Sequence, residues 1–194
     1  NNDGMGQIFM CGIAGVVNIN GNPVPDLVNR LSVMNQIQAH RGPDGEGVWT
    51  NAGQSAGLAH RRLTIIELSE DGHQPMVGKN ETVVSFNGEI YNYLELRKAL
   101  KDKWQFRTEG DTETILATYA ASDRECTSQL RGMFGFGLWD EKKRRLFCAR
   151  DRFCIKPFYY AQVGELLYFA SEVKAIVPFL PGIETDEVGL AQYL

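Results

Sequence analysis

Hydrophobic residues recur along this chain with two periods, which separate strands from helices. Short alternating or continuous apolar runs predict strands, and these occupy 11–19, 47–50, 56–61, 82–87, 133–139, 146–149, 158–161 and 166–170. In the first of them, Ile13, Val17 and Ile19 fall on alternate positions. Spacings of three and four residues predict helices, and these occupy 24–38, 92–102, 111–122, 171–177 and a last segment starting at 185.

The connections between the predicted strands favour antiparallel sheets. Strands 133–139 and 146–149 flank the charged run Lys142-Lys143-Arg144-Arg145, which we expect to be a solvated hairpin tip. Strands 158–161 and 166–170 flank Val163-Gly164 in the same way. Helices lie between groups of strands and must cover sheet faces. We therefore expect an α+β domain of antiparallel sheets layered with helices.

Length and composition narrow the class of protein. The chain has 194 residues, of which 43% are hydrophobic and 23% charged, as in a globular domain with one sizeable core. Its net charge of −4 and the absence of a basic stripe argue against a nucleic-acid partner. No apolar run approaches the roughly 18 residues of a membrane span. Four cysteines without CxxC pairs indicate a reduced, cytoplasmic protein, and three histidines without ligand spacing predict no metal site.

Cys11 is the first candidate for chemistry. It follows Met10 directly, so initiation at Met10 and removal of that methionine make Cys11 the N-terminal residue. A free α-amine has a pKa of roughly 7.7–8.0 and can accept the thiol proton. Taken alone, the residue is better explained as a small buried cysteine on a core strand. Residues 1–10 are then a leader, a propeptide or a remnant of recombinant expression, without the features of a secretory signal.

Asn87-Gly88 is predicted at the junction of a strand and a helix. An asparagine amide and a glycine N–H are two donors that can form an oxyanion hole, as acyl transfer requires. A plain Asn-Gly turn is the alternative.

Two adjacent arginines, and an aspartate at the start of a predicted helix, are candidate ligand-binding groups. Arg61 and Arg62 face opposite sides of a strand, so one of them is expected to point inward, where a carboxylate ligand would pair with it. The alternatives are an internal salt bridge, or two exposed arginines on an edge strand. His60 is expected to be a structural histidine with satisfied hydrogen bonds. Asp111 is a natural N-cap, and the same carboxylate can hold a ligand ammonium group.

Together these groups can bind an α-amino acid and attack its side-chain amide, which describes glutamine hydrolysis. The motifs also match a family in order along the chain. They are Met10-Cys11-Gly12-Ile13-Ala14-Gly15, His40-Arg41-Gly42-Pro43-Asp44, Leu58-Ala59-His60-Arg61-Arg62-Leu63, Phe86-Asn87-Gly88-Glu89-Ile90-Tyr91-Asn92, Gly110-Asp111-Thr112-Glu113, Gly132-Met133-Phe134-Gly135-Phe136, Arg150-Asp151-Arg152-Phe153 with Lys156-Pro157, and Ala170-Ser171-Glu172-Val173-Lys174-Ala175. The sequence resembles the N-terminal glutaminase domain of class II (N-terminal nucleophile) glutamine amidotransferases, in the branch of glutamine-dependent asparagine synthetase.

The resemblance implies a four-layer αββα sandwich of two antiparallel sheets between helices, the N-terminal-nucleophile (Ntn) hydrolase type. It implies that L-glutamine is hydrolysed to glutamate and ammonia through a γ-glutamyl thioester on Cys11, with the α-amine as base and Asn87 and Gly88 as the oxyanion hole. It assigns the glutamine pocket to Arg62 for the α-carboxylate, Asp111 for the α-ammonium group, and Glu89 and the backbones of Leu63 and Ile65 as lining.

The resemblance also sets expectations for the rest of the protein. We expect residues 11–181 to be the amidotransferase domain and 182–194 a linker and the start of a C-terminal synthetase domain missing from this chain. That domain uses ATP and Mg²⁺ to make asparagine from aspartate, whereas the glutaminase domain needs no cofactor or metal. A homodimer stays open. The alternatives are an inactive interaction module with a blocked N-terminus, or amidation of another carboxylate acceptor.

One position departs from the family. Cys154 stands where relatives usually have glycine. If the backbone there has a positive φ, the cysteine costs stability. We expect no effect on catalysis, because the position is far in sequence from the catalytic residues.

Overall fold

The computed structural model describes residues 10–63 and 72–184. Within these ranges, five strands form a first antiparallel sheet in the order β2-β3-β1-β9-β8. They are β1 (Gly12–Asn18), β2 (Gly45–Thr50), β3 (Ala56–Arg62), β8 (Tyr159–Val163) and β9 (Leu166–Ala170). A second antiparallel sheet has the order β4-β5-β6-β7. Its strands are β4 (Met76–Val77), β5 (Thr82–Ile90), β6 (Gly132–Asp140) and β7 (Arg145–Arg150).

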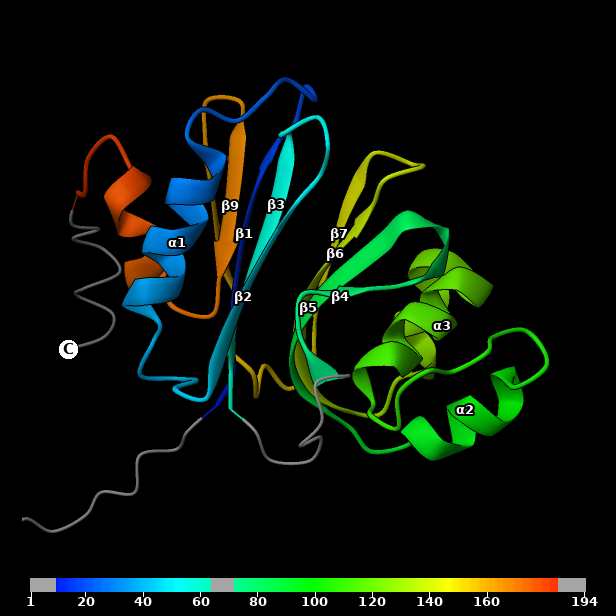
Figure 1. Ribbon diagram of the computed structural model, residues 1–194. Helices are drawn as coiled ribbons and strands as arrows, with labels where there is room; N and C mark the ends of the chain where they lie inside the picture. The colour runs from blue at the N-terminus through cyan, green and yellow to red at the C-terminus, as the bar shows by residue number, and fades with distance from the viewer. Residues whose placement is uncertain (1–9, 64–71, 185–194) are drawn as a thin grey trace, which may run out of the picture.

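Helices cover the outer face of each sheet (Figure 1). Helix α1 (Leu27–Ile37) packs on the first sheet, on the side away from the second. Helix α3 (Thr112–Ser122) packs on β5 of the second sheet, α2 (Tyr93–Leu100) lies against α3, and the short α4 (Cys126–Gln129) follows. The structure is thus the four-layer αββα arrangement, and this prediction is confirmed.

Three hydrophobic clusters fill the three interfaces between these layers. One lies between α1 and the first sheet, and another between the second sheet and α3. The third lies between the sheets and includes Ile13, Val17, Leu58, Trp139 and Phe169. Strand β1 contributes to two of these clusters, since its alternate residues face opposite sides. All seven of its residues are buried, so β1 is a central strand covered on both faces.

Glycine allows the two sheets to approach closely. A Cβ on Gly137 of β6 would lie 2.3 Å from the ring of Phe169, which comes from β9 of the other sheet. That ring also stacks on Phe158, with centroids 5.3 Å apart. Any side chain at position 137 would push the ring out of the layer between the sheets.

Two expectations about local structure were wrong in detail. Residues 171–177 do not form one helix; they contain the 3-10 turn Val173–Ala175, and a second turn, Val177–Phe179, begins at their end. Pro178 lacks the N–H that a continuing helix would use. Ile19 lies beyond the end of β1 and is 53% exposed, so it is not part of the face formed by Ile13 and Val17.

The charged hairpin tip is also not simply solvated. Lys143 Nζ lies 2.8 Å from the carboxylate of Asp123, and Arg145 pairs with the same carboxylate and with Tyr119. Arg144 donates to Ser55 Oγ across the gap between the sheets. The tip therefore ties β6 and β7 to the segment after α3 and to the first sheet.

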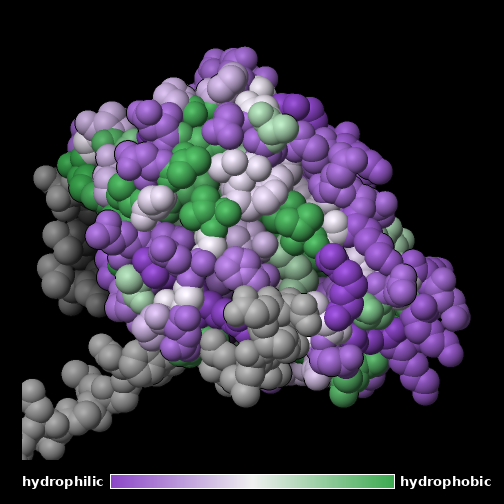
Figure 2. All heavy atoms as spheres, in the orientation of Figure 1, coloured by the Kyte–Doolittle hydropathy of each residue, from purple (hydrophilic) through white to green (hydrophobic). Residues whose placement is uncertain are grey.

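Over α2 and α3 the visible face is mostly hydrophilic (Figure 2). Among the described residues, no helix has the length and apolar character needed to cross a membrane. The helix expected from 185 and the pocket residue Ile65 lie outside the described residues.

Candidate active site

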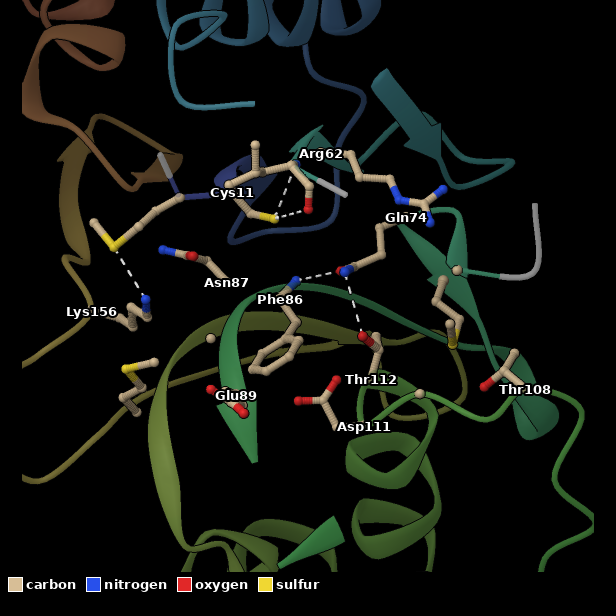
Figure 3. Close-up of a pocket in the computed structure, with 17 residues that line it drawn as sticks. Cys11, Arg62, Gln74, Phe86, Asn87, Glu89, Thr108, Asp111, Thr112 and Lys156 are labelled. Atoms are coloured by element: carbon tan, nitrogen blue, oxygen red, sulfur yellow. Dashed lines mark hydrogen bonds between the residues drawn. The ribbon is translucent and has the colours of Figure 1, made fainter. Parts of the chain in front are cut away.

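Cys11 lies directly before the central strand β1, at the edge of a pocket between the two sheets (Figure 3). Its Sγ accepts a hydrogen bond from the backbone N–H of Leu63 at 3.4 Å and lies 3.8 Å from the Leu63 carbonyl oxygen. Burial raises the pKa of the thiol, whereas the Leu63 hydrogen bond and the charge of Lys156 lower it. The thiol is therefore held at a fixed place but is not ionised by its surroundings alone.

Arg41 fixes the backbone of the same cysteine. Its Nε donates to the Cys11 carbonyl oxygen at 3.1 Å, and its other arm lies 3.2 Å from Glu172. Glu172 also binds His40 and Lys174. Arg41 lies in the His40–Asp44 motif, and the ion pair that holds it has its partner 131 residues away in the sequence.

Asn87 and Gly88 lie within β5, so the alternative of a plain turn is wrong. They pair with Gly135 and Phe134 of β6, and the strand continues to Ile90. Both residues line the pocket. Asn87 is only 2% exposed, and its Nδ2 has no hydrogen-bond partner among the described residues.

Gly88 is required by the space around it. A Cβ there would lie 2.2 Å from the carbonyl oxygen of Met133 on the adjacent strand. A side chain at this position would therefore push β5 away from β6 beside the Asn87 amide.

The two adjacent arginines separate as their strand positions predict. Arg61 donates to the Asn35 carbonyl oxygen of α1 at 3.0 Å and forms an ion pair with Glu46 at 2.8 Å. Arg62, the last residue of β3, lines the pocket. The inward-pointing arginine that the strand pattern predicts is therefore Arg62, whereas Arg61 pairs with a glutamate whose side chain is 61% exposed.

His60 is completely buried between the sheets and does not line the pocket. Its Nδ1 lies 3.3 Å from Ser85 Oγ, but its Nε2 has no partner among the described residues, so the expectation of a fully satisfied histidine was half right. Burial, with smaller effects from His73 and Arg62, lowers its pKa to about 3. It is therefore neutral at physiological pH.

Asp111 and Glu89 place two carboxylates in the pocket. Asp111 stands at the N-cap position of α3, but its side chain does not cap the helix. Its Oδ2 accepts instead from the Ile90 N–H of β5 at 2.9 Å. Burial raises its pKa, and nearby Glu89 raises it further, so the site favours a positively charged ligand between them.

The structure adds residues that the sequence analysis did not assign to the pocket. Gln74 joins its two sides, since its Oε1 accepts from the Phe86 N–H at 2.7 Å and its Nε2 lies 3.4 Å from Thr112 Oγ1. Met10, Thr108, Met133 and Lys156 also contribute to the lining. In the sequence, Gln74 and Lys156 each stand directly before a proline, and Lys156 belongs to a family motif. Neither feature predicts that the side chain points into the pocket.

Cys154 has a φ of 55°, so the condition under which a cysteine costs stability at this position is met. Its distance from Cys11 along the sequence suggested no link to the site, but the fold provides one. The turn containing Cys154 ends at Lys156, which lies in the pocket with Cys11. Separation along the sequence did not reflect distance in the fold, because the segment from β7 to β8 passes from one sheet to the other beside the pocket.

All four cysteines have free thiols, and no group of three metal-binding side chains occurs among the described residues. The pocket instead combines a thiol, an unpaired amide donor, an arginine and two carboxylates. These groups suit a zwitterionic ligand that carries a carbonyl group.

Comparison with known proteins agrees with this chemistry. Residues 10–194 match the glutamine amidotransferase domain family. Over 190 residues the chain is 43% identical to "Asparagine synthetase [glutamine-hydrolyzing] 1" of Bacillus subtilis, covering 95% of this chain and 29% of that protein. It is 41% identical over 183 residues to "Asparagine synthetase B [glutamine-hydrolyzing]" of Escherichia coli, covering 93% and 32%. The chain thus spans about a third of the length of these relatives.

The fold has solved counterparts as well. The glutamine phosphoribosylpyrophosphate amidotransferase of B. subtilis superposes with a TM-score of 0.73 at 17% identity, covering 86% of this chain and 43% of that one. The two packed sheets, with a cysteine at the start of a central strand, define an Ntn-hydrolase fold. The chain belongs to the glutamine amidotransferase domain family.

Proposed function

We propose that this domain hydrolyses L-glutamine to glutamate and ammonia, with Cys11 as the nucleophile. The observation that carries the proposal is the buried Asn87 Nδ2, which lacks a partner and lines the same pocket as Cys11 Sγ. An unpaired buried donor costs stability unless a ligand uses it. A carbonyl oxygen that becomes negatively charged during attack by the thiol is the ligand that this donor suits.

The binding groups fit the two ends of glutamine. Arg62 pairs with the α-carboxylate, and Asp111 with Glu89 holds the α-ammonium group. This places the side-chain amide toward Cys11 and Asn87. The Leu63 backbone contacts the nucleophile as well as the pocket, so it positions the thiol.

The reaction requires that Met10 be removed. In the full chain the Cys11 nitrogen is part of a peptide bond and has no basic lone pair, and Met10 lines the pocket that glutamine must enter. After removal, the α-amine takes the thiol proton and the sulfur forms a bond to the amide carbon. Asn87 Nδ2 and the Gly88 N–H stabilise the oxyanion. The protonated amine then gives its proton to the leaving nitrogen, and ammonia departs.

Water completes the cycle. It adds to the γ-glutamyl thioester with its proton passing to the α-amine, and glutamate leaves as the proton returns to the sulfur. His60 is a poor alternative base, because it lies outside the pocket and burial lowers its pKa to about 3.

The relatives support the role of the whole protein. Their names state glutamine-hydrolysing asparagine synthesis, and we propose that ammonia from this domain serves a synthetase domain that uses ATP and Mg²⁺ to make asparagine from aspartate. The four free thiols are in keeping with a cytoplasmic location. The assembled pocket disfavours the alternative of an inactive interaction module, and the names of these relatives favour aspartate over another carboxylate acceptor.

The test compares the full chain with a chain begun at Met10, after intact mass has confirmed each N-terminus. We expect glutamate release only from the sample that starts with Cys11. Equal activity in a verified uncleaved sample would contradict the role of the α-amine.

A further inference from the structure

Lys156 is a buried cation in the active-site pocket, at only 7% exposure. Its Nζ lies 3.1 Å from the Sδ of Met10, the residue that precedes the nucleophile. Among the described residues, no carboxylate lies within ion-pair distance of it. A thioether is a weak acceptor, so the ammonium is poorly compensated. Burial accordingly lowers the pKa of Lys156.

The chain nevertheless holds Lys156 firmly in this place. The Asp151 carboxylate accepts four backbone N–H groups, including that of Lys156 at 3.0 Å. Arg150 donates to the carbonyl oxygens of Lys156 at 2.6 Å and Cys154 at 2.7 Å. The turn is therefore rigid without any contribution from the lysine ammonium group, which is free to act elsewhere.

The other charged groups near Cys11 do not replace the effect of the Lys156 ammonium group. Arg41 is paired with Glu172, and Arg62 lies on the other side of Cys11 in the view of Figure 3. The Cys11 thiolate favours the protonated form of Lys156, and so do Glu89 of β5 and Asp151, whereas the charge of Arg41 disfavours it. Of the three cations near Cys11, Lys156 lowers the pKa of the thiol most, ahead of Arg41 and Arg62.

We propose that Lys156 is a positioning residue for the nucleophile, whose ammonium group favours the thiolate and the neutral α-amine of an N-terminal Cys11. The inference rests on the proposed function, because it requires Cys11 to be the terminal residue. Removal of Met10 takes away the thioether and leaves the ammonium facing the cavity next to Cys11 and Asn87 (Figure 3). A nearby cation stabilises an anion and disfavours a second cation, so both groups of Cys11 lose their protons at lower pH.

The experiment uses the processed chain with variants Lys156→Gln, Lys156→Met and Lys156→Arg. Lys142→Gln is the matched control, since it removes one exposed lysine at the β6–β7 tip. That tip adjoins the end of β6 that pairs with Thr82, whereas Asn87 pairs with Gly135 further along the strand. The rate of iodoacetamide alkylation of Cys11 is followed against pH by mass spectrometry of its peptide. The peptide must be resolved because Cys154 is also exposed.

We expect the alkylation midpoint to rise by about one pH unit in Lys156→Gln and Lys156→Met. The acid limb of kcat/KM for glutamine should move in the same direction. Lys156→Arg retains the charge and should stay near the parent, as should Lys142→Gln. An unchanged midpoint in both neutral variants, or an equal shift in Lys156→Arg or in Lys142→Gln, would overturn the proposal.

Thermal unfolding separates this role from a structural one. Replacing a poorly compensated buried cation with Met should leave Tm unchanged or raise it. A clear fall in the Tm of Lys156→Met would make Lys156 a structural residue and overturn the inference. If no processed sample hydrolyses glutamine, the proposed function fails, but the alkylation profile still decides the role of Lys156.

Discussion

The two sheets contribute to the pocket in opposite ways. On the side of the first sheet, the nucleophile already has partners: Cys11 Sγ contacts Leu63, and Arg41 Nε holds the Cys11 carbonyl oxygen. On the side of the second sheet, Asn87 Nδ2 has no partner among the described residues, and Lys156 has only a thioether. The protein thus holds the nucleophile in place on one side and leaves polar groups unsatisfied for the ligand on the other. This is the preorganisation expected where charge develops during a reaction.

Removal of the nucleophile should give the largest effect. We expect Cys11→Ala to abolish glutamate release without loss of fold, because no other described residue of the pocket carries a thiol or hydroxyl in the same place. Cys11→Ser should be nearly inactive, since a hydroxyl ionises far less readily. Circular dichroism and Tm verify the fold, and Cys154→Ser is the matched cysteine control. Substantial turnover by Cys11→Ala would exclude the mechanism.

Removal of the unpaired Asn87 amide should give the second largest effect. Asn87→Ala is expected to reduce kcat by about 10²–10³, as the loss of one oxyanion donor does. KM should change much less, because the donor acts mainly on the developing oxyanion. Asn87→Asp should lose at least as much, since it removes the donor and adds a negative charge. Steady-state kinetics would refute the assignment if Asn87→Ala kept the parent kcat.

The third effect concerns stability on the side of the second sheet. Glu113 is fully buried, and its carboxylate accepts from Trp104 Nε1 and from the backbone N–H groups of Arg107 and Thr108, among others. Glu113→Gln places an amide donor against these donors and should reduce the free energy of unfolding by about 2–3 kcal/mol. Denaturant titration measures this, with Glu109→Gln, whose carboxylate is 96% exposed, as the control.

The same residue predicts a pH dependence with a definite sign. Burial raises the Glu113 pKa, but the combined hydrogen bonds outweigh it and lower the pKa below the usual value. The stabilisation is therefore complete above the unfolded pKa of about 4.3 and is lost as the pH falls through the folded value. The difference between the parent and Glu113→Gln should shrink below about pH 4; a difference that grows with acid would contradict this.

The smallest effect is expected at the turn that joins the two sides. Cys154 adopts a left-handed backbone conformation, which costs a residue with a Cβ about 1–2 kcal/mol. Cys154→Gly relieves this strain but gains freedom in the unfolded chain, so we expect stabilisation by about 1 kcal/mol. Cys154→Ser keeps the strain and should not stabilise. Equal Tm values for the Gly and Ser variants would show that the strain is not the cause.

Local features of the sequence carried much of the fold and the chemistry. The periods of the apolar residues predicted every strand of the first sheet, and short turns predicted the hairpins that make both sheets antiparallel. The motifs around Cys11 and Asn87 indicated an acyl-transfer site. The side chains of Arg61 and Arg62 separate because successive residues of a strand face opposite sides.

What the sequence determined by itself was the set of elements and the chemical groups at their ends, because period, turn chemistry and residue type are local properties. The tertiary structure alone decided which groups meet. Lys156 enters the pocket through a turn 145 residues after Cys11, Arg41 is fixed by Glu172, and Asp111 turns from its own helix to β5. Burial between two sheets also decided that Asn87 is an unpaired donor within a strand, since desolvation and missing partners arise only when distant segments pack together.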